Sequence, residues 1–145
     1  MIHLEAITEE NWREDLSVAE SQKGYVSDPM RLLARAYAYR DKRSCACMIY
    51  DDDEPVGMAL YYDCPECQAY DLSQLFIDEK YQGKGYGREA ANQLLNRMQN
   101  DKKYDKVVLC YIEGNNQARS LYERLGFVHT GEADGDEIVM MKQLS

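Results

Sequence analysis

The chain has 145 residues, of which 45% are hydrophobic and 30% charged, so it is too apolar to be disordered and long enough to bury a core without disulfides. We therefore expect a single domain over residues 1–145. Its 26 acidic and 17 basic residues give a net charge of −9, which repels polyanions and excludes nucleic acid and anionic membrane surfaces as favoured partners. No apolar stretch approaches the roughly 18 residues of a spanning helix, and the N-terminus lacks a signal-peptide pattern, so we expect a cytoplasmic protein.

The first half of the chain is predicted to contain an edge strand, two helices and a hairpin. The strand starts at residues 5–7, and the first helix opens at 9–12. Residues 44–50 and 55–62 read as two strands around the acidic turn 51–54. A second helix is predicted over residues 29–39, where one stripe is apolar: Met30, Leu33, Ala34 and Ala38.

The second half alternates strands and helices. Residues 70–77 are predicted to form a strand with Leu72, Gln74 and Phe76 on one face. The other face then carries Asp71, Ser73, Leu75 and Ile77. Helices are predicted over 86–100 and 116–125, the latter ended by Gly126, and a last strand over 137–142. The apolar run 106–111 is expected to be a strand covered on both faces. The fold class is α/β, with a mixed sheet.

Four of the five cysteines form two closely spaced pairs, Cys45 with Cys47 and Cys64 with Cys67, which is the spacing of two halves of a zinc site. In a symmetric hairpin Cys45 faces a residue near Leu60, and Cys64 lies about four residues, or roughly 13 Å, further along. That separation is too large for one tetrahedral ion, so we expect no metal. Reduced thiols are the prediction, with zinc or a redox pair as alternatives.

The first concentration of chemistry is the segment Phe76–Arg88, where a strand leads into Gly83, Gly85 and Gly87 and these glycines open a helix. Glycines let backbone N–H groups turn towards an anion, and the start of a helix adds about half a positive charge. Lys84 and Arg88 are spaced to flank a pyrophosphate. The segment lacks the Gly-Lys-Ser/Thr of a P-loop and the glycine spacing of a dinucleotide fold. A plain flexible turn is the alternative.

The second concentration is the segment 113–127, in which Asn115 or Asn116 can cap a helix. Tyr122 shares the inward side of that helix with Ala118 and Leu125, so most of its ring is expected to be buried. A buried phenol needs a hydrogen-bond partner or a chemical role. Taken alone, Tyr122 is more often a core tyrosine than a catalytic one.

Together the two segments resemble the GNAT superfamily of acetyl-CoA-dependent N-acetyltransferases. The resemblance rests on Gln-x-x-Gly-x-Gly after a strand, followed about thirty residues later by Asn-x-x-Ala-x-x-Leu-Tyr-x-x-x-Gly-Phe, and it covers roughly residues 44–142. More narrowly, FIDEKYQGKGYG, NNQARSLYERLGF and the ending GEADGDEIVMMKQL look like the bacterial spermine/spermidine acetyltransferases, as does 22–26 more loosely. The resemblance implies a mixed, mostly antiparallel sheet flanked by helices.

The resemblance also implies roles for individual residues. Leu75, Phe76 and Ile77 match the strand whose backbone pairs with the pantetheine arm of acetyl-CoA, and Asn115 matches an asparagine beside that arm. Tyr122 matches the tyrosine that protonates the leaving thiolate. The segment matching the pyrophosphate loop consists of Gln82, Gly83, Lys84, Gly85, Tyr86, Gly87 and Arg88.

The predicted reaction is direct acetyl transfer to a primary amine, with a backbone N–H near Phe76 stabilising the oxyanion. A phenol of pKa about 10 suits a departing thiolate, and an amine of pKa about 10 arrives protonated, so a base is needed. In polyamine acetyltransferases an acidic residue usually stands at the position of Ser73. Asp71, two residues earlier on the strand, is the candidate base here, acting through a water; a solvated strand-end carboxylate is the alternative.

The acceptor is expected to lie between the N-terminal helices and the loop before Tyr70. Candidates for holding its distal ammonium are Glu20, Asp28 and Glu66, with Ser73 beside them; plain surface charge is the alternative for the acids. A polyamine or diamine is the favoured acceptor. Another amine (aminoglycoside, amino acid or protein N-terminus) and a non-catalytic acyl-CoA sensor are the alternatives. The resemblance also implies a possible homodimer.

Overall fold

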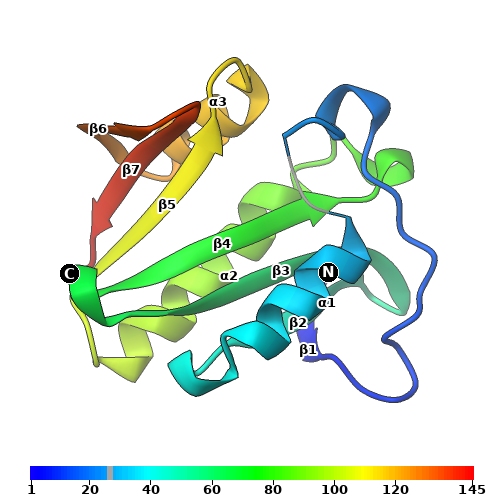
Figure 1. The fold of residues 1–145 in the computed structure, drawn as a ribbon. Coiled ribbons are helices and arrows are strands. Elements are labelled where there is room, and N and C mark those ends of the chain that lie inside the picture. The colour runs from blue at the N-terminus through cyan, green and yellow to red at the C-terminus, as the bar shows by residue number, and fades with distance from the viewer. Residues whose placement is uncertain (26–27) are drawn as a thin grey trace.

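The computed structural model describes residues 1–25 and 28–145, and in them seven strands form one sheet in the order β1-β2-β3-β4-β5-β7-β6 (Figure 1). The strands are β1 (Ile2–Ala6), β2 (Cys45–Asp51), β3 (Glu54–Cys64), β4 (Ala69–Ile77), β5 (Lys106–Ile112), β6 (Val128–Asp134) and β7 (Glu137–Gln143). The helices are α1 (Pro29–Ala38), α2 (Tyr86–Asp101) and α3 (Asn116–Arg124). Neighbouring strands are antiparallel except β4 and β5, which confirms the mixed, mostly antiparallel sheet.

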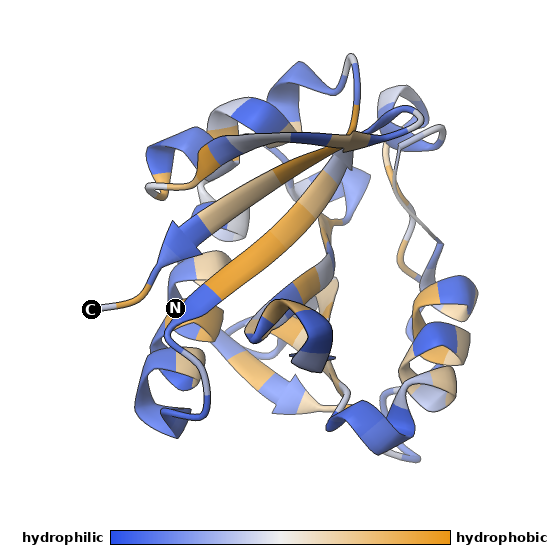
Figure 2. Cartoon of the chain, turned by 60° about the vertical axis from the view of Figure 1, so that its left-hand side comes forward, coloured by the Kyte–Doolittle hydropathy of each residue, from blue (hydrophilic) through white to orange (hydrophobic). Residues whose placement is uncertain are grey.

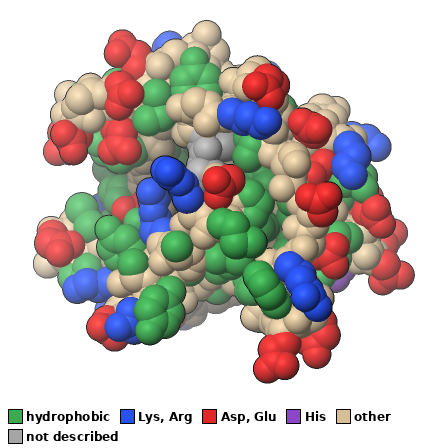
Figure 3. Space-filling model, turned by 45° about the vertical axis from the view of Figure 1, so that its right-hand side comes forward, with side chains coloured by type: hydrophobic (Ala, Val, Ile, Leu, Met, Phe, Trp, Pro, Cys, Tyr) green, Lys and Arg blue, Asp and Glu red, His purple; other side chains and the backbone are tan. Residues whose placement is uncertain are grey.

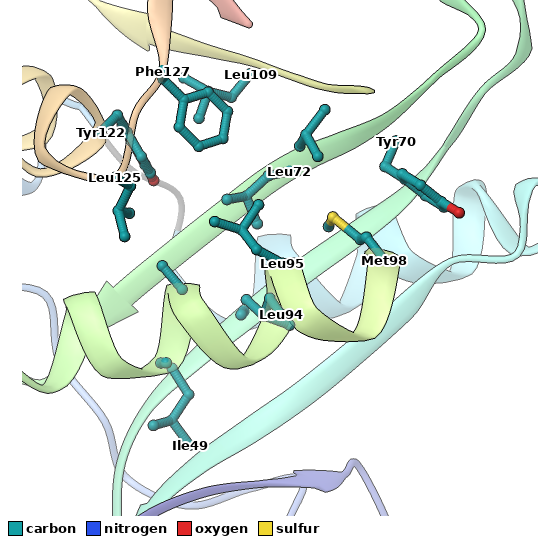
Figure 4. Packing of buried hydrophobic residues seen from close by; sticks show 14 of the residues in the cluster. Ile49, Tyr70, Leu72, Leu94, Leu95, Met98, Leu109, Tyr122, Leu125 and Phe127 are labelled. Atoms are coloured by element: carbon teal, nitrogen blue, oxygen red, sulfur yellow. The ribbon is translucent and has the colours of Figure 1, made fainter. Parts of the chain in front are cut away.

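Apolar residues bury both faces of this sheet in two separate clusters. On one face α2 packs Ala90, Ala91, Leu94, Leu95 and Met98 against the strands, as its periodicity predicts (Figure 4). Tyr122 of α3 and Leu125, the residue that caps the end of α3, join the same cluster. On the other face Leu32 of α1 packs with Met48, Met58, Leu60 and Phe76. The sheet therefore lies between two apolar clusters, one on each face.

A β-bulge in β4 overturns the predicted alternation of its side chains. Tyr61 of β3 pairs with Leu72 and Leu60 pairs with Gln74, so Ser73 is the extra residue. Leu72 therefore packs in the α2 cluster, whereas Phe76 packs in the α1 cluster. The prediction that Leu72 and Phe76 share a face was wrong, because one inserted residue reverses the pleat beyond it.

The prediction that β5 is covered on both faces was also wrong. Figure 2 shows a strand that is hydrophobic over most of its length. Val107 and Leu109 are buried in the α2 cluster, but Cys110, on the opposite face, is exposed. The apolar run does not mark burial on both sides, because α1 covers β2 and β3 and does not reach over β5.

The N-terminal region differs most from the prediction. Residues 9–13 form turns instead of the expected helix, since the Asn11 side chain accepts a hydrogen bond from the Thr8 N–H and donates one to the Ala6 carbonyl. Helix α1 begins and ends near its predicted bounds but is rotated: Leu32 is fully buried, and Met30 is 57% exposed. This rotation turns Arg35, one turn after Leu32, towards the sheet.

The remaining elements follow the sequence closely. The hairpin β2–β3, the strand β7 and the end of α3 lie where predicted, and Gly126 adopts a φ of 95° just beyond α3. Strand β6 was not predicted, because all seven of its residues are exposed and carry no apolar alternation. No helix within the described ranges is long and apolar enough to cross a membrane.

Candidate active site

Strands β4 and β5 diverge (Figure 1). A cleft lies between them. They pair only at Tyr70 with Val107 and at Asp71 with Val108. Beyond these pairs the rest of β4 has no neighbouring strand on that side within the described chain. The resulting cavity has a volume of about 750 Å³ and is lined by α1, β4, β5, α3 and the start of α2.

The glycine loop forms one end of the cleft. Gly83 and Gly85 have φ values of 78° and 81°, a conformation that other residues adopt only with strain, and Gly85 is the N-cap of α2. Gln82 ties the loop down by donating to the Ile77 carbonyl at 2.8 Å and accepting from Gln117 of α3 at 3.0 Å. The N–H groups that begin α2 are thereby available to an anion.

The predicted phosphate-loop residues are brought together here with one exception. Gln82, Gly83, Gly85, Tyr86, Gly87 and Arg88 all line the cleft. Lys84 belongs to the same loop but is not among the lining residues. A Cβ added at Gly83 or Gly85 would meet no atom within 4 Å, so the space over the loop is open. A pyrophosphate fits this loop, because the loop supplies backbone N–H donors and the positive charge of Arg88.

Tyr122 lies on the opposite wall, on α3, and is 8% exposed. Its ring packs edge-on against Phe127, and Figure 4 shows its hydroxyl directed towards β4. Burial raises the pKa of Tyr122 to about 12, so the phenol keeps its proton throughout the physiological range. No described side chain forms a hydrogen bond with its hydroxyl, which leaves the O–H able to donate into the cleft.

Asn115 connects the cleft to the N-terminal segment. It is 3% exposed and caps α3 by accepting from the Ala118 N–H at 3.2 Å. Its amide also pairs reciprocally with the Gln22 side chain, at 3.1 and 3.3 Å. Gln22 and Tyr25 line the cleft although sequence reasoning did not select them; Val26, part of the weaker resemblance there, lies outside the described residues.

Asp71 lines the cleft from β4, where that strand leaves β5. Its burial raises the pKa of its carboxyl to about 6, an effect that the nearby Arg35 opposes and Glu137 reinforces. The Asp71 carboxylate has no hydrogen-bond donor among the side chains of the described chain. Asp71 is therefore a partly buried base, and its carboxyl loses its proton as the pH rises through about 6.

Ser73 also lines the cleft, but its surroundings are basic and aromatic. Its hydroxyl oxygen accepts from Arg35 Nη1 at 3.1 Å and from the Tyr62 hydroxyl at 3.2 Å. The Tyr62 ring stacks on Tyr39, with ring centroids 4.1 Å apart. Sequence reasoning missed Arg35 because it placed the apolar stripe of α1 on Met30; a stripe on Leu32 and Ala36 would have turned Arg35 inward.

The other three acceptor candidates are not among the residues that line the cleft. Glu20 pairs with Lys23, Asp28 caps α1 by accepting from the Arg31 N–H, and Glu66 lies on the short turn before β4. None of the three lines the cavity in the part of the chain described here. Their role in holding an acceptor stays a prediction without geometric support.

The cysteines are free thiols, and the described residues contain no group of three metal-ligating side chains. Cys45 pairs with Tyr61, one residue from the predicted partner Leu60. Cys64 lies three residues beyond Tyr61 along β3. The sulfurs of Cys64 and Cys67 are 2.7 Å apart on the turn before β4. This pair lies outside the cleft lining, whereas Cys110 is part of it.

A sheet split between two parallel strands, with a glycine loop at one end of the gap and a buried phenol on its wall, defines the class of acetyl-CoA-dependent acetyltransferases. The chain belongs to the acetyltransferase (GNAT) family, whose model matches residues 4–127.

Curated relatives at full length point the same way. The chain is 32% identical over 155 residues to a spermine/spermidine N(1)-acetyltransferase of Bacillus subtilis, with 99% of each chain covered. A probable spermine N(1)-acetyltransferase of B. subtilis subsp. natto has the same identity and coverage.

Solved structures share the fold at lower identity. The spermidine N-acetyltransferase of Vibrio cholerae, in complex with CoA and spermine, superposes with a TM-score of 0.76 at 20% identity, covering 98% and 95% of the two chains. The ribosomal-protein-S18-alanine N-acetyltransferase of Escherichia coli gives 0.75 at 15%, covering 100% and 95%. Because these two proteins acetylate different amines, the fold by itself leaves the acceptor open.

Proposed function

We propose that this acetyltransferase transfers the acetyl group of acetyl-CoA directly to a primary amine of a polyamine or diamine. The pantetheine arm lies along the unpaired edge of β4 from Leu75 to Ile77, and the pyrophosphate lies on the loop from Gln82 to Arg88. The observation that carries this placement is the cleft itself, which joins the glycine loop, the free edge of β4 and Tyr122.

In the proposed reaction the neutral amine attacks the thioester carbonyl, and a backbone N–H near Phe76 stabilises the oxyanion. As the C–S bond breaks, the departing thiolate takes the proton of the Tyr122 hydroxyl, and the proton that the attacking nitrogen loses as it becomes an amide restores that hydroxyl through the solvent. The phenol carries its proton when the thiolate leaves, because its pKa of about 12 lies far above neutral pH.

Asp71 is proposed to accept the proton of the incoming ammonium, through a water where the acceptor is out of direct reach. It lies on the α1 face of the sheet, whereas Tyr122 lies on the α2 face. The cleft between β4 and β5 is lined from both faces, which supports an arrangement with the acceptor and the thiol leaving group on opposite sides of the reacting carbonyl.

The polyamine as acceptor class is supported by the full-length relatives at 32% identity. The net charge of −9 supports it as well, because an acidic protein attracts polycations. Ser73 argues in the other direction, since it supplies no carboxylate beside the acceptor.

The test is release of thiol from acetyl-CoA with spermine, spermidine, putrescine, lysine and an aminoglycoside, in the wild type and in Tyr122→Phe. Turnover of spermine or spermidine that falls strongly in Tyr122→Phe supports both the acceptor and the acid. Turnover of another amine alone keeps the chemistry and rejects the polyamine. CoA binding without turnover of any amine would favour a sensor.

A further inference from the structure

The acceptor end of the cleft carries two unpaired charges of opposite sign, one on each side of Asp71. Arg35 reaches it from α1 and donates to Ser73 Oγ at 3.1 Å, with no ion pair to any described carboxylate. Glu137 reaches it from the start of β7, is exposed, and likewise has no ion pair among the described residues. Both lie close enough to Asp71 to act on its charge.

The sheet register separates these two groups in space. Asp71 pairs with Val108 of β5, and Glu137 pairs with Ile112, four residues further along the same strand. At about 3.3 Å per residue, Glu137 lies roughly 13 Å along β5 from the level of Asp71. Arg35 instead lies directly over β4, on the Ser73 hydroxyl.

The side chains between Asp71 and Glu137 form an open track. Cys110 and Ile112 project from β5 on the face that α1 leaves uncovered, and both line the cleft. On the face drawn in Figure 3, basic and acidic side chains lie next to one another near the centre instead of forming one charged patch. An acceptor chain that extends from Asp71 therefore meets the positive charge of Arg35 if it runs under α1. It meets the negative charge of Glu137 if it runs along β5.

We propose that Arg35 and Glu137 together determine acceptor selectivity by directing the distal ammonium of a polyamine away from α1 and along β5 towards the start of β7. The inference rests on the proposed function and adds to it the direction of the bound chain. A second ammonium close to the reacting amine meets Arg35 and is repelled, whereas one further along the chain is attracted by Glu137.

The experiment compares each diamine with the monoamine of equal length. The kcat/KM of the diamine divided by that of the monoamine isolates the effect of the second ammonium. The short pair is 1,4-diaminobutane and butylamine, and the long pair is 1,8-diaminooctane and octylamine. Arg35→Ala is expected to raise the short-pair ratio by roughly three- to tenfold. Glu137→Gln is expected to lower the long-pair ratio by a similar factor. Matched controls are Arg31→Ala on the exposed side of α1 and Glu132→Gln on β6.

Three results would overturn the proposal. Equal losses on diamines and monoamines in Arg35→Ala would make Arg35 a structural residue. A selective loss on 4-aminobutanoate in that variant would make it an anchor for a carboxylate. Unchanged long-pair ratios in Glu137→Gln would remove the exit along β5.

Binding separates this inference from the proposed function. Calorimetry with the CoA-loaded protein measures the Kd of the same four amines without requiring turnover. If no amine is acetylated but the Kd ratios shift as expected in Arg35→Ala and Glu137→Gln, the proposed reaction fails and the charge selectivity stands. If all four amines bind equally in every variant, the selectivity fails as well.

Discussion

Tyr122 and Asp71 are both shifted by burial, but the shift prepares them for opposite proton transfers. Loss of hydration disfavours the charged form of each group and raises both pKa values, to about 12 for Tyr122 and about 6 for Asp71. At neutral pH the phenol therefore holds its proton, whereas most of the carboxylate is ionised. Burial thus makes the Asp71 carboxylate a stronger base than an exposed aspartate, and it keeps the proton on the Tyr122 hydroxyl.

Tyr122→Phe is expected to lower kcat by roughly 10²- to 10⁴-fold, the usual contribution of a general acid. The free energy of unfolding should change by less than about 0.5 kcal/mol, because the hydroxyl has no partner among the described residues and the ring stays. Steady-state kinetics and thermal unfolding check the two expectations. Tyr104→Phe, outside the cleft, is the matched control, and an unchanged kcat in Tyr122→Phe would reject the acid.

Asp71→Asn is expected to lower kcat/KM at least tenfold and to abolish an acidic limb with an apparent pKa near 6. The pH profile of kcat/KM between about pH 5 and 9 measures this limb. Asp41→Asn on the exposed turn after α1 is the control. If Asp71→Asn kept the wild-type kcat/KM and its acidic limb, the base would be another group.

The same substitution should stabilise the fold above pH 6. The pKa of Asp71 is about 6 in the folded state and 3.8 ordinarily, so the folded protein binds this proton more tightly than the unfolded chain does. The resulting contribution to the free energy of unfolding is complete below pH 3.8 and is lost as the pH rises through about 6. Asparagine carries no charge to desolvate, so Asp71→Asn should gain up to about 3 kcal/mol at pH 8 and nothing below pH 4. Denaturant unfolding at both pH values tests this dependence.

At the scale of the elements, the site depends on how β4 is held by β3 while it is released by β5. The bulge at Ser73 turns Leu75 and Ile77 to the α2 face, and Gly57 of β3 lies against the end of β4. Gly57 pairs with Ile77, and a Cβ on it would overlap the Phe76 carbonyl oxygen. Close packing at this one position fixes the strand that is proposed to bind the pantetheine arm.

Gly57→Ala is expected to cost about 2 kcal/mol or more of unfolding free energy, since the neighbour it meets is backbone and cannot rotate away. It should also raise the KM for acetyl-CoA, because β4 must move at Phe76. Chemical denaturation and acetyl-CoA titration measure the two effects. Gly24→Ala, with no atom within 4 Å of the added Cβ, is the control; a stable variant with normal KM would show that β3 does not fix this strand.

At the scale of the whole molecule, the two clusters on either side of the sheet separate the two binding regions. The α2 and α3 side holds the glycine loop and Tyr122, and the α1 side holds Arg35, Ser73 and Asp71. The cofactor and the acceptor are thus expected to enter from different faces. The net charge of −9 acts on both, against the anionic cofactor and for a cationic acceptor.

This charge predicts a dependence on salt that differs between substrates. The KM of spermine should rise with ionic strength from about 0.05 to 0.5 M more steeply than that of butylamine, because screening weakens the attraction of a polycation most. The KM of acetyl-CoA should stay level or fall over the same range, since the repulsion from the acidic surface is screened. Parallel salt responses of spermine and butylamine would contradict a role for the overall charge.

The sequence by itself determined the elements with strong periodicity and the residues carried by contiguous motifs. Helix α2, the hairpin β2–β3, the glycine loop and Tyr122 were all predictable, because each depends on neighbours within a few turns of chain. Residues 9–13, the exposed strand β6 and the rotation of α1 were not, since side-chain hydrogen bonds and packing across the sheet decide them.

Only the tertiary structure decided the acceptor side of the site. One bulged residue in β4 reverses the pleat, and a rotated α1 turns Arg35 onto Ser73, so residues about forty positions apart become neighbours. Glu137 joins them through strand pairing with β5. Such contacts arise from register and packing over long sequence separations, which leave no local pattern to read.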